Sequence, residues 1–512
     1  MKNVELGLLF QEGCVLQRDK TIKIWGNGTE GTQVTVTLDG NSSCDTIKDG
    51  TFFCVLPAHS AAIGLTLKVS AKCKDGTEEI EEIEHVSVGD VWLAGGQSNM
   101  EFFLRYDAHY EETMRQPKNN NIHMFNVPRI AYRGQVRKVN WDSGYWFEEQ
   151  DEAWENFSAP GYYFVRDLQP RIDVPIGIIG CNWGGTPACA WMSEEYLEDE
   201  PLHQVIREYE ADMGDAKPEQ LYQDSLIGFE HEDSDEHQKL WQGMMYGLSL
   251  KEQKQWMIDH ADDPAIPIGP WHMYRPSGLY HQMLEKVIPY SIKGAIWYQG
   301  ESDSCHADLY GELLENMIKC WREKWGDEFP FLFVQLAPFE LWLDCTGDHY
   351  PEVRHQQELV AKRVPGTGMI SIMDLGMYED IHPKRKKEVG ERLALLARGV
   401  VYGEEILCHS PELLSGEMLQ DSMCVKLYFA HTGDGLELRG DDAENIMLGG
   451  FEVEVDGKPC GFDIELQKEN ILINLAHKAV NSCRVKFAWK NYVKVNLFNS
   501  AGLPVKPFTW EM

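Results

Sequence analysis

Short apolar runs separated by turn residues characterise the first part of the chain. They cover residues 21–25, 33–38 and 65–70. In the second run, Val34, Val36 and Leu38 alternate with polar positions, and a period of two predicts strands that bury one face. Turn-forming pairs such as Asp39-Gly40 lie between the runs. We therefore predict that residues 1–88 form a small β-sandwich domain.

From residue 88 onward, apolar runs alternate with segments of helical spacing. The runs that predict strands are residues 91–94, 174–180, 294–298, 331–336 and 369–373. Residues 309–325 and 388–401 instead place apolar side chains three and four positions apart, which predicts helices with one buried face. Strands separated by helices favour a parallel sheet with right-handed crossovers. Residues 89–404 are thus predicted to form an α/β domain.

Two further segments complete the predicted architecture. Residues 193–290 are acidic, mostly helical in pattern and interrupted by Pro and Gly at 264–270. They indicate an insertion at the active-site edge, either a solvated cap or a wall of the substrate cleft. Residues 405–512 predict a C-terminal β domain. Its strand-like runs are residues 425–429, 451–455, 471–475, 484–489 and 493–498.

Composition narrows the class of protein. The chain has 82 acidic and 47 basic residues, a net charge of −35, so we expect neither nucleic acid nor an anionic membrane as a partner. No signal peptide or membrane-spanning run is visible, and we expect a cytoplasmic protein. The 13 cysteines form no CxxC pair and show no zinc spacing, which favours free thiols in a reducing compartment. A Cys44–Cys54 disulfide is the alternative.

The most informative stretch is residues 91–100. An apolar run leads into two glycines and then into Gln97-Ser98-Asn99. A serine just beyond a parallel strand lies at the edge where α/β folds bind ligands, and the N–H groups of the turn suit a developing oxyanion. Ser98 is therefore a candidate nucleophile. The alternative is that Ser98 is the N-cap of a helix.

A nucleophilic serine needs a base and a group that orients the base. Asp380 and His382 follow the last predicted strand and are separated by one residue. The carboxylate can meet one imidazole nitrogen and leave the other for Ser98. Pro383 biases His382 away from the αR conformation. The alternative for this Asp-x-His-Pro motif is a capped turn before a helix.

Two glycines and a glutamine follow other predicted strands. Gly184 and Gly185 lack Cβ atoms and can approach a substrate closely, so one of their N–H groups is a candidate oxyanion donor. The side-chain amide of Gln299 is a second candidate. The alternatives are a tight turn for the glycines and a bracing hydrogen bond for the glutamine.

Glu301 and Asp303 are the nearest approach to a catalytic carboxylate pair. A pair of this kind raises the alternative of a glycosidase, with an acid and a base flanking a glycosidic bond. That alternative leaves Ser98 and His382 unexplained. In a bracing role, the two carboxylates would accept hydrogen bonds from the loop of Ser98 or from an arginine.

Four short motifs in this order resemble a known family, the sialate O-acetylesterases, which are carbohydrate esterases of the SGNH hydrolase superfamily. The motifs are residues 96–100, 184–186, 297–302 and 380–383. Flanking segments extend the resemblance over nearly the whole chain. They are residues 15–19, 24–26, 275–280, 389–394 and 502–508.

The resemblance implies hydrolysis of acetyl esters on sugars through an acetyl-enzyme, with Ser98 as nucleophile, His382 as base and Asp380 as its orienter. It implies oxyanion donation by the Ser98 N–H, a glycine of the 184–185 pair and Gln299. It also implies a flavodoxin-like three-layer α/β/α core with flanking β-sandwich domains, and no metal or organic cofactor. The residues expected to bind substrate are Gln97, Asn99, Trp183, Arg275, Glu301 and Asp303.

Two positions depart from the family pattern. Cys189 stands where many members carry an acid, and Asp303 stands where asparagine is frequent. A chain of net charge −35 would repel an anionic sugar such as sialic acid unless Arg275, Arg105 or Arg166 lines the pocket. Acetylated xylan or mannan, which are neutral plant glycans, are therefore alternative substrates. A non-catalytic carbohydrate-binding protein is the alternative from another class.

Overall fold

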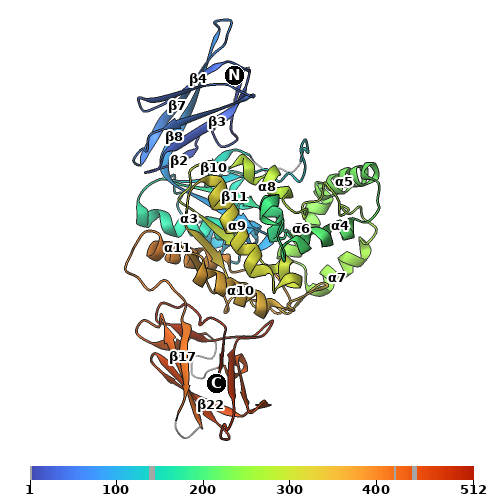
Figure 1. The fold of residues 1–512 in the computed structure, drawn as a ribbon, viewed down its shortest axis with the longest axis vertical. Coiled ribbons are helices and arrows are strands. Elements are labelled where there is room, and N and C mark those ends of the chain that lie inside the picture. Colours follow the sequence, from blue (N-terminus) through green and yellow to red (C-terminus); the bar gives the residue numbers. More distant parts are fainter. Residues whose placement is uncertain (1–2, 138–143, 420–422, 441–446) are drawn as a thin grey trace.

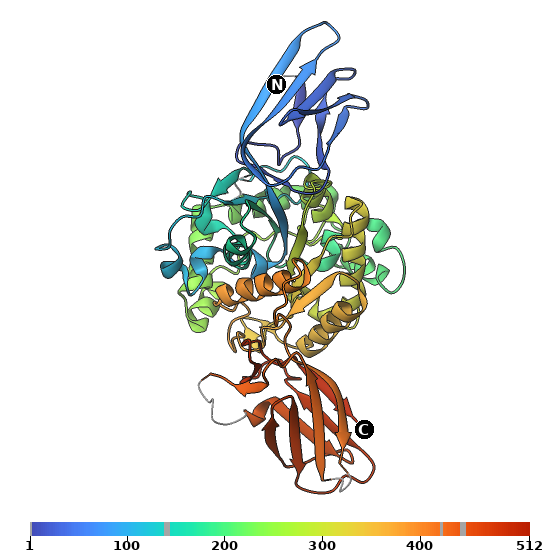
Figure 2. The ribbon, with the colours of Figure 1, turned by 90° about the vertical axis from the view of Figure 1, so that its left-hand side faces the viewer.

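A computed structural model describes residues 3–137, 144–419, 423–440 and 447–512. The chain forms three parts in a row along the long axis of the molecule, with a β region at each end and an α/β region between them (Figures 1 and 2). The protein is of the α/β class and contains several β-sheets.

One long strand, β8 (Glu78–Gly96), joins the N-terminal β region to the α/β region. Its first half pairs antiparallel with β7 (Ala62–Lys72), and β2 (Val15–Gln17) runs parallel to its middle. Its second half lies at the centre of the α/β sheet. A single strand therefore crosses residue 88, where a domain boundary is predicted. The division into residues 1–88, 89–404 and 405–512 stays a prediction.

Three of the remaining N-terminal strands form a separate antiparallel sheet, and the other two extend the sheet of β7. These five strands are β1 (Val4–Leu6), β3 (Ile22–Gly28), β4 (Gln33–Leu38), β5 (Asn41–Thr46) and β6 (Thr51–Leu56). The predicted alternation holds in β4, where Val34, Val36 and Leu38 are buried and the intervening residues are partly exposed. The burial of one face fixes the register, because a shift by one residue would expose all three side chains.

The central sheet has the strand order β10-β9-β11-β8-β12-β13-β16. Its strands besides β8 are β9 (Ile122–Asn126), β10 (Trp146–Glu148), β11 (Ile176–Asn182), β12 (Gly294–Tyr298), β13 (Phe331–Val334) and β16 (Thr367–Ile370). From β9 to β16 every neighbouring pair is parallel. All five predicted strands are present. The carboxyl ends of β8, β11 and β12 consequently lie side by side.

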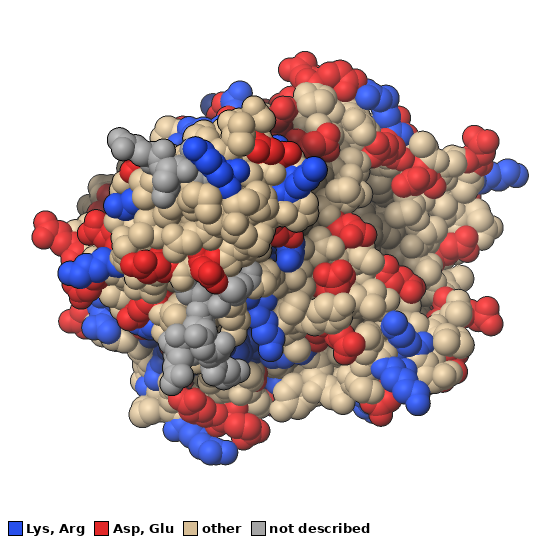
Figure 3. All heavy atoms as spheres, turned by 90° about the horizontal axis from the view of Figure 1, so that it is seen from below, with Lys and Arg blue, Asp and Glu red and all other residues tan. Residues whose placement is uncertain are grey.

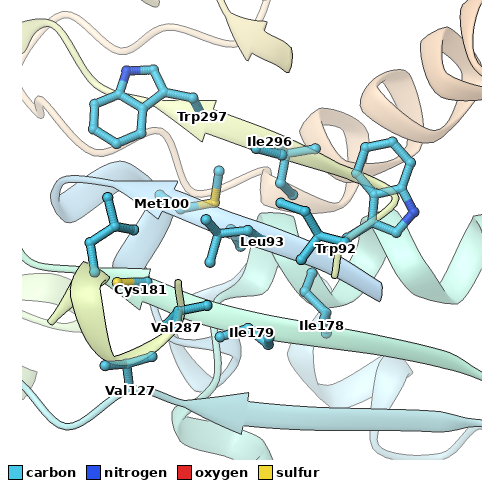
Figure 4. Close-up of a cluster of buried hydrophobic side chains, with 14 of the residues drawn as sticks. Trp92, Leu93, Met100, Val127, Ile178, Ile179, Cys181, Val287, Ile296 and Trp297 are labelled. Atoms are coloured by element: carbon cyan, nitrogen blue, oxygen red, sulfur yellow. The ribbon is translucent and has the colours of Figure 1, made fainter. Parts of the chain in front are cut away.

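Helices cover both faces of this sheet. On one face α3 (Ala159–Ile172) packs against α11 (Lys386–Val400), and the Trp92 ring meets Phe164 of α3 at 4.9 Å. On the other face α9 (Tyr310–Trp325) places Trp321 at 5.5 Å from Trp297, and α10 (Tyr350–Arg363) packs beside α9. Figure 4 shows apolar side chains of β11, β8 and β12 in this core. Burial on both faces explains why these strands are continuous apolar runs.

Residues 193–290 fold mainly into helices beside the sheet (Figure 1). The longer ones are α4 (His203–Met213), α5 (Pro218–Glu232), α6 (Asp235–Tyr246) and α7 (Leu250–Asp259). Local chemistry sets their starts: Ser234 caps α6, and Ser249 with Glu252 forms a capping box at α7. Each buries only a few residues, so most side chains of these helices are partly or fully exposed.

Two four-stranded sheets form most of the C-terminal region. The first contains β17 (Glu412–Met418), β18 (Cys424–Ala430), β22 (Phe462–Gln467) and β23 (Asn470–Leu475), and the second contains β20 (Phe451–Val455), β21 (Lys458–Pro459), β24 (Cys483–Phe487) and β26 (Phe508–Glu511). The rings of Phe451, Phe487 and Phe508 cluster in its core. The predicted strand at 493–498 is wrong for most of its length, because β25 (Leu497–Asn499) begins only at Leu497 and pairs with β19 (Leu436–Leu438).

All thirteen cysteines are free thiols, so no disulfide joins Cys44 to Cys54. Within the described ranges, no group of His, Cys, Asp and Glu side chains could hold a metal ion. Among the same residues, no helix has the length and apolar character needed to cross a membrane. On the face shown in Figure 3, acidic side chains are interspersed with basic ones.

Candidate active site

Ser98 is the first residue of a short helix, α1 (Ser98–Glu101), that follows β8 directly. Gly96 makes this turn possible, because its φ is +141° and a Cβ there would lie 2.2 Å from the Tyr298 carbonyl oxygen. The helix N-cap is Gln97, so the alternative assignment of Ser98 as the N-cap is wrong. As the first helical residue, Ser98 has an N–H without a partner inside the helix.

His382 reaches Ser98 from the loop before α11. Its Nε2 lies 3.1 Å from Ser98 Oγ, and its side chain is buried. The Trp342 ring packs against it in a T-shaped arrangement, with the ring centres 5.0 Å apart and the planes at 87°. Trp342 belongs to the short hairpin β14 (Leu341–Trp342) and β15 (Cys345–Thr346). The imidazole is therefore held in place by packing as well as by the hydrogen bond.

Asp380 holds His382 chiefly through the backbone. Its Oδ1 accepts a hydrogen bond from the His382 N–H at 2.8 Å and lies 3.4 Å from Nδ1, while its Oδ2 pairs with Lys384 Nζ at 2.8 Å. Burial opposes the charge of Asp380, but His382 and Lys384 outweigh it and lower the pKa to about 2. Burial also lowers the pKa of His382, against the pull of Asp380. At pH 7 a neutral imidazole thus faces Ser98 with an ionised carboxylate behind it.

Gly184 is the glycine that lies beside the serine. A Cβ on Gly184 would be 3.3 Å from the Ser98 Cβ. Its N–H donates to Glu101 Oε2 at 2.5 Å, and Glu101 also pairs with Arg129. An anionic oxygen therefore already occupies the position to which this N–H points. Gly185 has φ +74°, and a Cβ there would clash with the Tyr274 hydroxyl.

Gln299 does not present its amide to the cavity. The residue is fully buried, its Nε2 donates to Asp303 and to the Thr186 carbonyl oxygen at 3.3 Å, and its Oε1 accepts from Tyr310 at 3.1 Å. Gln299 therefore braces neighbouring loops and is not positioned as the expected oxyanion donor. Asp303 has the same bracing role, because it accepts hydrogen bonds from Gln299 and from the Ala188 N–H, the latter at 2.9 Å.

The two amides beside Ser98 connect the four motifs. Gln97 lines the cavity, and its Oε1 accepts from the N–H groups of Gly300 and Ser302. Asn99 is buried outside the cavity lining; its Nδ2 donates to Glu301 Oε1 at 2.6 Å and to the Ile381 carbonyl oxygen at 3.0 Å. The side chain of Asn99 is thus used to hold the loop of His382, not to contact a ligand.

Lys386 is a site residue that the sequence did not reveal. It is fully buried, its Nζ donates to Asn99 Oδ1, and it lies 4.9 Å from the Phe102 ring centre and 5.0 Å from that of Tyr298. Burial lowers its pKa to about 7, while Glu301 favours its charge. Its sequence signal is a run of four basic residues, 384–387, which is typical of a solvated helix start.

A cavity of about 720 Å³ opens over Ser98 and His382. Trp183, Gly184 and Glu301 line it, and α5 and α6 contribute further walls, among them Trp241. The insertion therefore does shape the cleft. Arg275, Arg105 and Arg166 do not line it; Arg129 and Arg137 do. Arg275 lies in a segment that resembles the family, but neither that segment nor the sequence around the other arginines shows which of them reaches the cavity.

A half-buried serine bonded to a buried histidine at the edge of a parallel sheet is an arrangement of serine hydrolases. Comparisons with known proteins point to one kind of serine hydrolase. Residues 254–397 match a family model described as "Carbohydrate esterase, sialic acid-specific acetylesterase". Sialate O-acetylesterases of Mus musculus and Homo sapiens are 27% identical over 435 and 428 residues, covering 77% of this chain and 72% and 70% of theirs.

A solved structure is similar over the whole length. It is a carbohydrate acetylesterase from Xanthomonas citri, with a TM-score of 0.74, 27% identity and coverage of 99% of both chains. These matches confirm the predicted resemblance to the sialate O-acetylesterase family, and they confirm the prediction of a carbohydrate O-acetylesterase.

Proposed function

We propose that the protein is a serine esterase that removes O-acetyl groups from a carbohydrate through an acetyl-enzyme intermediate. The observation that carries the proposal is the 3.1 Å contact between Ser98 Oγ and His382 Nε2 at a cavity of about 720 Å³. The sialate O-acetylesterase relatives support the substrate class. The parallel strand order and the helices on both faces support a flavodoxin-like SGNH hydrolase core between two β-sandwiches.

In the proposed first step, His382 Nε2 accepts the proton of Ser98 as Oγ attacks the acetyl carbonyl carbon. Asp380 stabilises the imidazolium that forms, because its own pKa of about 2 keeps it ionised. Collapse of the tetrahedral intermediate breaks the bond to the sugar oxygen, and His382 returns the proton to that oxygen. In the second step, a water molecule attacks acetyl-Ser98 with the same base and releases acetate.

The proposed oxyanion donors are the N–H groups of Ser98 and Gly184. Gly184 is favoured over Gly185 because it lies directly against Ser98. In the described structure Glu101 accepts from the Gly184 N–H, so the reacting carbonyl oxygen would replace that carboxylate. Gln299 takes a bracing part in this proposal.

The glycosidase alternative receives no support from the geometry. Asp303 lies outside the lining of the cavity and accepts hydrogen bonds from Ala188 and Gln299, so it does not flank a bond in the cavity together with Glu301. Two sugar classes fit the proposed chemistry: O-acetylated sialic acid, and a neutral acetylated glycan such as xylan or mannan.

The test is hydrolysis of an aryl acetate by the wild-type chain and by Ser98→Ala. We expect loss of turnover and of the acetylated Ser98 peptide in a quenched digest, with an unchanged circular dichroism spectrum. Ser304→Ala, a serine of the same cavity wall, is the matched control and should retain both. Full activity of Ser98→Ala would refute the nucleophile, and glycan binding without acetate release would favour a binding protein.

A further inference from the structure

More acidic than basic side chains line the cavity. Among the described residues, its acidic lining residues are Glu101, Glu232 and Glu301, and its basic ones are Arg129 and Arg137. Burial lowers the pKa values of the lining histidines His237 and His382, so both rings are neutral at pH 7. A ligand therefore meets three carboxyl groups and two guanidinium groups.

Both arginines already have acidic partners. Arg129 Nη1 contacts Glu101 Oε1. Arg137 Nε donates to Asp233 Oδ1 at 2.7 Å, and its Nη2 lies 3.8 Å from Glu232 Oε2. A sugar carboxylate entering here would have to compete with these acids, and like charges at close range cost several kcal/mol. The arginines thus neutralise the cavity; they do not make it attractive to an anion.

The cavity also disfavours negative charge on its own side chains. Burial raises the pKa of Glu232 to about 7, although Arg137 lies beside it. Burial likewise raises the pKa of Glu301, although Asn99 donates to it. Groups that are pushed toward their neutral forms indicate surroundings in which one more carboxylate would be poorly stabilised.

Four buried polar atoms of the lining residues have no hydrogen-bond partner among the described residues: His237 Nδ1, His382 Nδ1, Arg137 Nη1 and Glu301 Oε2. His382 Nδ1 faces Asp380 at 3.4 Å. Arg137 Nη1 is a donor, and Glu301 Oε2 is an acceptor. Buried polar groups in native proteins are normally satisfied, so Arg137 Nη1 and Glu301 Oε2 are one donor and one acceptor of the lining residues that still need partners when a ligand binds. Hydroxyl groups can serve both. Trp183, Trp241 and Trp342 add flat apolar walls of the kind that pack against the C–H faces of sugar rings.

We propose that the cavity binds the O-acetylated sugar units of a neutral glycan, with Arg137 donating to sugar hydroxyls and Glu301 accepting from them. The proposal rests on the proposed esterase function and specifies its substrate class. Arg137 is stacked over Trp183, with its guanidinium carbon 5.3 Å from the ring centre, so the donor and the aromatic wall form one surface.

The decisive experiment compares 9-O-acetyl sialic acid with its C1 methyl ester, which is the same sugar without the negative charge. Acetate release is measured for both, and for acetylated xylan and mannan, with the wild-type chain. We expect kcat/KM to be at least about tenfold higher for the methyl ester than for the acid. A tenfold ratio is what a single weak repulsion between the sugar carboxylate and an acidic side chain would produce. Equal values, or a preference for the acid, would overturn the proposal.

An aryl acetate separates this outcome from failure of the esterase assignment. If the aryl acetate is not hydrolysed, the proposed function fails; if it is hydrolysed and the acid is preferred, only the substrate class fails. Arg137→Met should lower the ratio of kcat/KM for acetylated xylan to that for aryl acetate by about tenfold. Arg133→Met, an exposed arginine outside the cavity lining, should leave it unchanged. An unchanged ratio in Arg137→Met would refute the donor role, and if that variant does not fold, the acid and ester comparison decides.

Discussion

Replacing Asp380 by asparagine should reduce both the stability and the activity of the protein. Asparagine retains an oxygen that can accept the His382 backbone N–H, so the substitution mainly removes the charge. That charge is held between the imidazole of His382 and the ammonium of Lys384, with the Asp380 side chain only 12% exposed.

The magnitude follows from the pKa. The pKa of Asp380 is about 2 in the folded chain, against an ordinary value of 3.8, and this difference corresponds to about 2 kcal/mol of stability. Because the folded pKa is the lower one, this stability is fully present above pH 4 and is lost as the pH falls through 2. At pH 7 the Asp380→Asn variant should therefore unfold with about 2 kcal/mol less free energy. Loss of support for the imidazolium should lower kcat/KM for an aryl acetate by about 10²–10⁴-fold.

Urea unfolding at pH 7, followed by tryptophan fluorescence, measures the first effect, and steady-state kinetics measures the second. Asp344→Asn, an exposed aspartate in the adjacent β14–β15 hairpin, is the matched control and should lie within about 0.5 kcal/mol of wild type. Asp380→Asn with the same stability and kcat/KM as this control would refute the reasoning.

Three further predictions concern the same edge of the sheet. Burial lowers the pKa of His382, so activity should be lost only as pH falls below about 6.5; a flat kcat/KM profile from pH 7 down to pH 4 would count against a histidine base. Lys386→Met removes a buried ammonium that lowers the pKa of His382, so the acid limb of that profile should move to higher pH, and an unmoved limb would contradict the coupling. Gly96→Ala should destabilise the fold by about 3 kcal/mol or more, because Gly96 has a φ of +141° and a Cβ there would meet the Tyr298 carbonyl oxygen. Its control is Gly40→Ala, at a position of positive φ with open space around it. That variant should lose about 1 kcal/mol in the same urea unfolding assay.

The strands of the central sheet were predictable where burial on both faces made them uniformly apolar. β12 matches its predicted range, β13 ends two residues before its predicted end, and β11 begins and ends two residues later than predicted. β9 was missed because its five residues mix His and Asn with apolar side chains, a pattern without clear periodicity. The full length of β8 was missed because its first half is rich in glutamate, and only pairing with β7 keeps it extended.

The positions of Ser98, Asp380 and His382 were determined by the sequence, because each follows a strand and the carboxyl ends of parallel strands meet at one edge. Tertiary structure alone decided how their neighbours are used. Gln299 and Asn99 have amides that could face a ligand or the protein, and their direction depends on partners up to 287 residues away. The pairing of arginines with acids in the cavity was likewise fixed by long-range packing. Chain order specifies which residues reach the edge of the sheet, and packing specifies where each side chain points.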